Sequence, residues 1–169
     1  MQGIEKSRTQ VQTYLSQNID KGKKIVVIGV GNEDRHDDFV GAYIVQALEK
    51  KGLQRENLMI IDAGTGPSNY IADIATWEAD CLVMVDAVDA QEPAGTLLLV
   101  EKDQLHSQSV DSHSNAKVLL VEFLIGLKPD LMVIIVGIQV KDISLKLALT
   151  KEVQQSADWL VEVLNNILR

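Results

Sequence analysis

Residues 26–42 read VVIGVGNEDRHDDFVGA and join a continuous apolar run to a turn that is crowded with charge. The apolar run is rich in β-branched residues, which is typical of a central strand in a parallel sheet. It ends at a Gly-x-Gly-Asn turn, and three carboxylates and an imidazole follow within a few residues: Asp34, His36, Asp37 and Asp38. One Asp is enough to cap a helix and complement its dipole. The cluster therefore calls for a second, chemical explanation.

Strand and helix patterns alternate along the rest of the chain. Apolar runs predict strands at 24–30, 57–63, 81–87, 95–101 and 131–137. Apolar residues at helical spacing predict helices at 38–51, 68–77 and 150–168, and a further helix that contains 118–125 and starts near Ser112–Asn115. This order predicts an α/β three-layer sandwich, in which helices cover both faces of a twisted, mostly parallel five-stranded sheet.

One connection is too short for a parallel crossover. Only eight residues separate Ala87, at the end of the third strand, from Thr96 in the fourth. A parallel crossover needs a dozen or more residues. The fourth strand is therefore expected to be antiparallel and to lie at an edge of the sheet.

The length of 169 residues suits a single domain with a real core. Residues 1–23 are mostly polar with a thin apolar helical stripe, and we expect an N-terminal helical extension before one α/β domain at 24–169. The first residues carry no secretory segment, and the apolar runs fall short of the roughly 20 residues that a membrane span needs. We expect a cytoplasmic protein with no membrane insertion.

Charge and cysteine content exclude other classes of function. The net charge is −8 and no cluster of Lys and Arg stands out, which argues against binding of nucleic acid. The single cysteine, Cys81, opens an apolar run and is expected to be a buried thiol rather than a nucleophile. Gly29-x-Gly31 resembles the start of a dinucleotide-binding motif, but Asp34 occupies the third glycine position and would repel a pyrophosphate.

Acidic residues follow three of the predicted parallel strands. Asp38, Asp62 and Asp86 should meet at the carboxyl edge of the sheet, where such folds bind ligands. The segment DSHSN, at 111–115, can add His113 from a loop on the same side. Each residue alone also fits a turn, a cap or a surface position. Their convergence favours a divalent-metal site with oxygen and nitrogen ligands.

Five blocks of this sequence resemble the maturation endopeptidases of [NiFe]-hydrogenases, in order and spacing, over roughly 24–165. They are VIGVGNEDRHDDFVGAYIVQAL, DAGTGP, LVMVDAVDA, DSHSN and VGIQ. The last two look closest to the branch that serves formate-hydrogenlyase-type hydrogenases. The resemblance implies an endopeptidase that cuts a C-terminal extension from the precursor of a hydrogenase large subunit after nickel insertion.

The resemblance also implies roles for particular residues. Asp38, Asp86 and His113 match the family's metal-contacting trio by position and are the expected catalytic residues. The segment matching the family's glycine-rich recognition loop consists of Asp62, Ala63, Gly64, Thr65 and Gly66. The metal is expected to be the nickel held in the precursor, with zinc or another divalent ion as a substitute in vitro. The precursor is the expected partner, and the protein is expected to be a monomer.

The sequence departs from the family at three positions. The family usually has glycine where His36, Phe39 and Ala63 stand. His36 is either a loop residue that faces solvent or an auxiliary fourth ligand, since imidazole suits nickel and zinc. Two other functions stay open at this point, namely a self-contained metallohydrolase of small molecules and a maturation chaperone that binds the precursor without cutting it.

Overall fold

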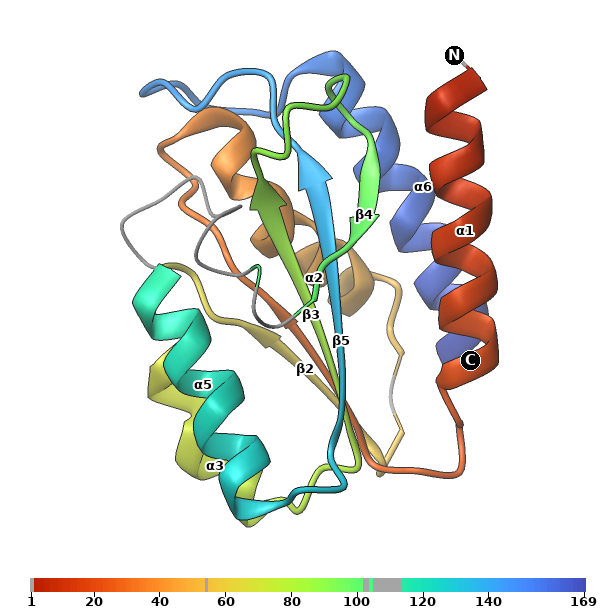
Figure 1. The fold of residues 1–169 in the computed structure, drawn as a ribbon, viewed down its shortest axis with the longest axis vertical. Helices are drawn as coiled ribbons and strands as arrows, with labels where there is room; N and C mark the ends of the chain where they lie inside the picture. Colours follow the sequence, from red (N-terminus) through yellow and green to blue (C-terminus); the bar gives the residue numbers. More distant parts are fainter. Residues whose placement is uncertain (1, 54, 102–103, 105–113) are drawn as a thin grey trace.

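The computed structural model describes residues 2–53, 55–101, 104 and 114–169. Its centre is a five-stranded sheet with the order β2-β1-β3-β5-β4 (Figure 1). The strands are β1 (Ile25–Gly29), β2 (Leu58–Asp62), β3 (Cys81–Val88), β4 (Leu97–Leu99) and β5 (Met132–Gln139). Strands β2, β1, β3 and β5 are parallel to their neighbours, whereas β4 pairs antiparallel with β5 at the edge. The antiparallel edge strand predicted from the short connection is confirmed.

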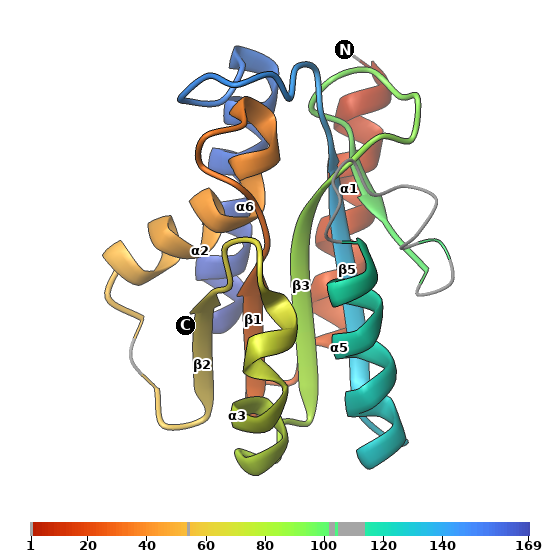
Figure 2. The same ribbon diagram turned by 90° about the vertical axis from the view of Figure 1, so that its left-hand side faces the viewer.

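Helices cover both faces of the sheet, as predicted. α1 (Gln2–Asn18), α2 (Val40–Lys50) and α6 (Lys151–Leu168) lie on one face, and α3 (Ile71–Thr76) and α5 (Ser114–Leu127) lie on the other (Figure 2). Short 3-10 turns precede α2 and α3, namely η1 (His36–Phe39) and η2 (Pro67–Tyr70). Among the described residues, no helix has the length and apolar character that a membrane crossing requires.

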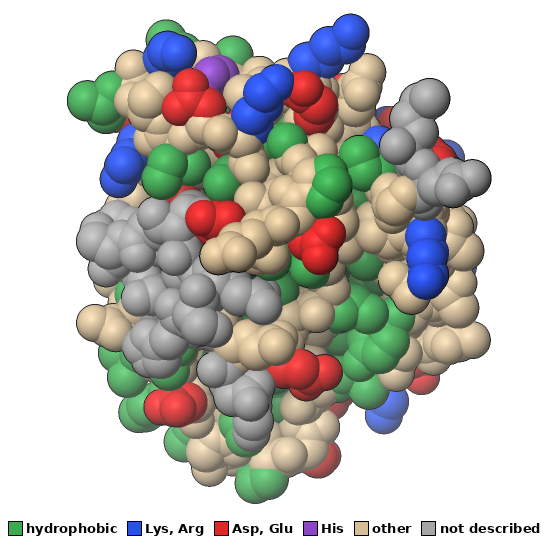
Figure 3. Space-filling view, turned by 45° about the horizontal axis from the view of Figure 1, so that its top comes forward, with side chains coloured by type: hydrophobic (Ala, Val, Ile, Leu, Met, Phe, Trp, Pro, Cys, Tyr) green, Lys and Arg blue, Asp and Glu red, His purple; other side chains and the backbone are tan. Residues whose placement is uncertain are grey.

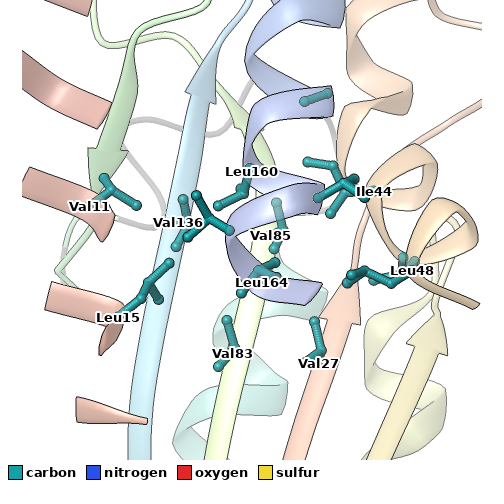
Figure 4. Close-up of a cluster of buried hydrophobic side chains, with 14 of the residues drawn as sticks. Val11, Leu15, Val27, Ile44, Leu48, Val83, Val85, Val136, Leu160 and Leu164 are labelled. Atoms are coloured by element: carbon teal, nitrogen blue, oxygen red, sulfur yellow. The ribbon is translucent and has the colours of Figure 1, made fainter. Parts of the chain in front are cut away.

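The core has two layers because successive strand residues point to opposite faces. Val83, Val85 and Val136 pack against Leu160 and Leu164 of α6 (Figure 4). The alternate residues of β3 and β5 pack instead against α3 and α5. Every residue of β3 is buried, as expected for the middle strand of a parallel sheet.

Helix α1 contributes to the first of these layers. Val11 and Leu15 are buried in the same cluster as residues of α6 and β4 (Figure 4). Ile19, just after the helix, belongs to this cluster too. The helix also meets the edge strand through a side chain, because the backbone N–H of Leu97 donates to Ser7 Oγ at 3.3 Å. The apolar stripe of the N-terminal segment is therefore part of the core.

The edge strand β4 is shorter than the predicted 95–101, and Gly95, just before it, packs against α6. Gly95 has φ +82°, and a Cβ there would lie 2.6 Å from the Glu152 carbonyl oxygen. Its own carbonyl accepts a hydrogen bond from Ser156 Oγ at 2.6 Å, and its backbone N–H donates to the carbonyl oxygen of Gln139 in β5 at 2.8 Å. Gly95 therefore links the edge of the sheet to α6.

The start of α2 lies unusually close to the ends of two strands. A Cβ on Gly41 would lie 2.2 Å from the Val30 carbonyl oxygen and 2.3 Å from that of Val85. Only glycine fits at such a distance without backbone movement. Val85 directly precedes Asp86, and η1, which contains Asp38, directly precedes α2. This contact therefore brings the η1 turn to the carboxyl end of β3.

Candidate active site

The three aspartates predicted to converge lie at the carboxyl edge of the sheet. Asp62 is the last residue of β2, Asp86 lies near the end of β3, and Asp38 lies in the turn between β1 and α2. In the space-filling view, acidic side chains lie across the middle of this face, and Lys and Arg side chains lie mainly toward its rim (Figure 3). The edge therefore favours cations over anions.

Asp38 and Asp86 are both buried, with exposed fractions of 2% and 1%. Carboxylates are rarely buried to this degree unless a charge, a hydrogen bond or a ligand compensates for the lost hydration. The backbone around Asp38 is tightly held, because its carbonyl oxygen would lie 2.2 Å from a Cβ on Gly31. Two buried carboxylates on neighbouring elements are the strongest indication of a chemical site in the described part of the chain.

Asp86 forms an ion pair that the sequence patterns did not predict. Its Oδ2 lies 2.5 Å from Nζ of Lys117, on α5, and its Oδ1 accepts a hydrogen bond from the backbone N–H of Ala87 at 2.9 Å. Lys117 is fully buried. One signal could have pointed to this lysine: it lies in the first turn of a helix, where the helix dipole disfavours a positive charge.

His113, the third predicted ligand, lies outside the described residues. Helix α5 begins at the next residue in the sequence, Ser114. Among the residues that the structure does describe, no three His, Cys, Asp or Glu side chains are grouped closely enough to hold a metal ion. The described donors are thus two carboxylates, which suit a hard or borderline divalent cation and would need further ligands.

Asp37, next to Asp38, is a structural residue that the sequence did not distinguish from its neighbour. It is fully buried. Its Oδ2 accepts hydrogen bonds from the backbone N–H groups of Lys141 and Asp142, at 2.8 Å and 3.0 Å. Thr150 donates to it twice, from the backbone N–H and from the hydroxyl. Asp37 therefore fastens η1 to the segment between β5 and α6.

His36 faces the same segment. Its Nδ1 is hydrogen-bonded to the carbonyl oxygen of Ala148, and its Nε2 lies 3.8 Å from Oδ2 of Asp142. The side chain is 15% exposed and is held against this segment at the surface of the protein. The second interpretation, an auxiliary ligand, would require the ring to leave both contacts. The backbone of His36 has φ +49°, a region that favours glycine.

The predicted recognition loop, 62–66, is held by its first residue. Oδ1 of Asp62 accepts a hydrogen bond from the backbone N–H of Gly64 at 3.0 Å, and Oδ2 accepts one from Nε2 of Gln46 at 2.7 Å. The backbone bond is an Asp-turn interaction, which aspartate commonly forms with the residue two positions later. Gly64 adopts φ +51°, and its carbonyl accepts from the backbone N–H of Gly31. The loop is therefore tied both to itself and to the turn after β1.

A cleft of about 290 Å³ separates this loop from the turn after β1. Its walls include Asn32, Glu33, Asp34 and Phe39 on one side and Asp62 and Thr65 on the other. Glu33 and Asp34 are exposed, and Asp62 is partly buried. The cleft is lined mainly by polar and acidic side chains.

Cys81 is not part of this site. It lies at the first residue of β3, at the opposite end of the strand from Asp86, and it is buried. Burial raises the pKa of its thiol to about 11, so the thiolate that a nucleophile requires is not populated near neutral pH. The expected inert thiol is confirmed.

Residues 42–167 match the family model described as hydrogenase maturation protease. The chain belongs to the hydrogenase maturation protease family. The matched region contains Asp62, Asp86 and His113 and begins just after Asp38. The resemblance of the sequence blocks is confirmed, and neither the small-molecule metallohydrolase nor the chaperone is favoured.

Individual relatives and solved structures agree with this assignment. The chain is 30% identical over 152 residues to a Methanocaldococcus jannaschii protein whose name places it among the hydrogenase maturation proteases, covering 86% of this chain and 89% of the relative. The crystal structure of the [NiFe] hydrogenase maturation protease HycI from Thermococcus kodakarensis superposes with a TM-score of 0.79 at 22% identity, covering 94% and 98% of the two chains. The hydrogenase maturating endopeptidase HybD from Escherichia coli superposes with a TM-score of 0.69 at 23% identity, covering 85% and 91%. The protein is thus a hydrolase, an endopeptidase of hydrogenase maturation.

Proposed function

We propose that this endopeptidase removes a C-terminal extension from the precursor of a [NiFe]-hydrogenase large subunit, after nickel has been inserted into that precursor. The observation that carries the proposal is the pair of buried carboxylates, Asp38 and Asp86, at the carboxyl edge of a protease of this family. We treat nickel as part of the precursor substrate and not as a resident cofactor of this enzyme.

The donor set supports a site that reads a metal held by another protein. Asp38, Asp86 and His113 would supply two carboxylate oxygens and one imidazole nitrogen. Three ligands leave coordination positions open, whereas a structural metal site is usually closed by four protein ligands. Zinc or another divalent ion could occupy the same donors in vitro.

We propose aspartic-type chemistry at the scissile bond. Bound nickel would orient the cleavage site of the precursor and act on it as a Lewis acid. The carboxylates of this chain would contact that metal and accept a proton from the attacking water, as general-base catalysis requires. The burial of Asp38 and Asp86 supports this role, because electrostatic interactions are stronger in a site that excludes water.

Recognition of the polypeptide is assigned to the loop from Asp62 to Gly66, consisting of Asp62, Ala63, Gly64, Thr65 and Gly66. This loop forms one wall of the 290 Å³ cleft, and the hydrogen bonds of Asp62 hold it in one conformation. A preformed loop lowers the entropy lost when an extended segment of the precursor binds. We propose that the enzyme acts in the cytoplasm, as a monomer.

Coexpression with a hydrogenase large-subunit precursor tests the proposal. Mass spectrometry of the large subunit should show loss of the C-terminal extension with the parent enzyme, and no loss when nickel is omitted. Asp38→Asn, Asp86→Asn and His113→Ala should each abolish processing. Asp130→Asn, which alters an exposed carboxylate just before β5 at the opposite edge of the sheet, is the control and should process normally.

Two outcomes would contradict the proposal. A nickel-loaded precursor that binds the parent enzyme and stays uncut would indicate a chaperone. A full equivalent of metal in protein purified without chelators would indicate a self-contained metallohydrolase. Metal analysis of the purified protein therefore accompanies the processing assay.

A further inference from the structure

The ion pair between Asp86 and Lys117 occupies the oxygen that a metal would need. Oδ1 of Asp86 accepts the backbone N–H of Ala87, and Oδ2 lies 2.5 Å from the Lys117 ammonium. A cation that approaches Oδ2 must displace this ammonium or lie beside it. Both routes oppose binding, the first by removing the partner of a buried charge and the second by repulsion between like charges.

Lys117 is in a costly position for a lysine. It is the fourth residue of α5, so its positive charge lies at the positive end of the helix dipole. It is also fully buried, although lysine is among the residues least often found inside proteins. Removing one member of a buried ion pair leaves an uncompensated charge, so the Lys117 ammonium and the Asp86 carboxylate compensate each other. The carboxylate that is proposed to contact a metal therefore already has a positive charge beside it.

We propose that the Lys117 ammonium is the counter-ion of the Asp86 carboxylate and prevents free divalent ions from binding Asp86. Only a metal that the precursor delivers displaces this ammonium. The inference rests on the proposed function, because it assumes that Asp86 contacts the precursor's nickel. Contacts between the precursor and the recognition loop would provide the binding energy that displaces the ammonium. A free ion brings no such contacts and binds weakly. Lys117 thus acts as a positioning residue that makes the protease selective for metal-loaded precursor.

A second ion pair of the same composition provides a matched control. Lys128, near the other end of α5, lies 2.6 Å from Asp80, which directly precedes β3. Both side chains are about one-third exposed, and the pair is at the amino end of the strand. Lys128 directly follows the last residue of α5, so Lys128→Met removes a lysine and its ion pair at the other end of this helix without touching the carboxyl edge.

The test is calorimetric titration of the metal-free protein with NiCl₂ near neutral pH. We expect Lys117→Met to bind Ni²⁺ at least about tenfold more tightly than the parent, because the competing charge is gone. Lys117→Arg keeps the charge and should stay close to the parent, as should Lys128→Met. Adding Asp86→Asn to Lys117→Met should abolish the gain in Ni²⁺ affinity. This result would show that the gain depends on the Asp86 carboxylate.

Equal Ni²⁺ affinity in Lys117→Met and Lys128→Met would overturn the inference, as would weaker binding by Lys117→Met. Circular dichroism and thermal unfolding establish that each variant is folded. If Lys117→Met does not fold, Lys117→Gln, which also lacks the charge but keeps a polar end, is held to the same criterion.

The titration contains no precursor, so its result is independent of the processing assay. A parent enzyme that processes precursor while Lys117→Met gains no affinity would refute only the role of Lys117. An affinity gain in a protein that never cuts the precursor would refute only the proposed protease substrate. Free Ni²⁺ should also inhibit processing by Lys117→Met at concentrations that leave the parent unaffected.

Discussion

Asp37 and Thr150 are 113 residues apart in the chain and are joined by two hydrogen bonds. The backbone N–H of Thr150 donates to Oδ1 of Asp37 at 2.7 Å, and its hydroxyl donates to Oδ2 at 2.9 Å. Thr150 is the N-cap residue of α6, but its side chain makes no capping bond. Its hydroxyl instead anchors the residue that directly precedes Asp38. The position of the candidate active site therefore depends on the start of the last helix.

Asp37→Ala is expected to lower the free energy of unfolding by about 2–4 kcal/mol, because buried backbone N–H groups lose the charged acceptor. Chemical denaturation with urea measures the change. The matched control is Asp34→Asn, which alters an exposed carboxylate in the same turn and should change stability by less than about 0.5 kcal/mol. Equal effects of the two substitutions would contradict the anchoring role of Asp37.

Alanine at Gly41 and at Gly126 should have opposite effects on stability. Gly41→Ala would press a Cβ against the Val30 and Val85 carbonyl oxygens and should destabilise the protein by at least about 2 kcal/mol. Gly126, inside α5, has no atom within 4 Å of a built Cβ. Gly126→Ala should therefore stabilise the protein by about 0.5–1 kcal/mol through helix propensity. Thermal unfolding of both variants measures the two changes in stability. Destabilisation by both substitutions would contradict the prediction.

Asp62→Ala is expected to weaken recognition of the precursor more than the chemical step. The loop from Asp62 to Gly66 would lose its hydrogen bonds to Gly64 and Gln46, which are at 3.0 Å and 2.7 Å. We expect KM for the precursor to rise about tenfold, with a smaller change in kcat. Gln46→Ala removes only one of the two bonds and should have a smaller effect. A fall in kcat at constant KM would assign Asp62 to the chemistry instead.

His36→Gly should leave the affinity for Ni²⁺ unchanged. Both ring nitrogens face the segment between β5 and α6, through Ala148 and Asp142. The variant loses these contacts but relieves a left-handed backbone conformation that costs a non-glycine residue about 1–2 kcal/mol. Its stability should therefore lie within about 1 kcal/mol of the parent. Calorimetry with NiCl₂ and with ZnCl₂ tests the first point, and a marked loss of affinity would establish His36 as a ligand.

Asp142 should make part of the stability dependent on pH in the acid range. Hydrogen bonds from the backbone and side chain of Ser144, together with Lys146, lower its pKa to about 2. Because the folded pKa lies below the unfolded value near 4, the stabilisation is present above about pH 4 and is lost as the pH falls toward about 2. Asp142→Asn should therefore reduce stability at pH 6 and have little effect near pH 2. Urea midpoints at several pH values measure this difference, and a constant difference at all pH values would contradict it.

Residue patterns alone were enough to predict the architecture and the edge of the sheet at which the site lies. Alternating strand and helix patterns indicated a parallel sheet, and eight residues between Ala87 and Thr96 indicated an antiparallel edge strand. These inferences succeed because residue spacing and connection length are local properties. Strand order in a parallel α/β sheet then brings Asp38, Asp62 and Asp86 to the same edge.

The contacts of each polar residue near that edge could not be predicted without the packing of the elements. Asp37 and Asp38 are identical neighbours in the sequence, yet Asp37 binds the segment that leads to Thr150. Lys117 lies on the same helical stripe as the buried Leu120, Val121 and Leu124, but only the packing of α5 places it beside Asp86. Periodicity indicates which residues are buried, but a partner for a buried charge comes from another element, and its position depends on how the elements pack.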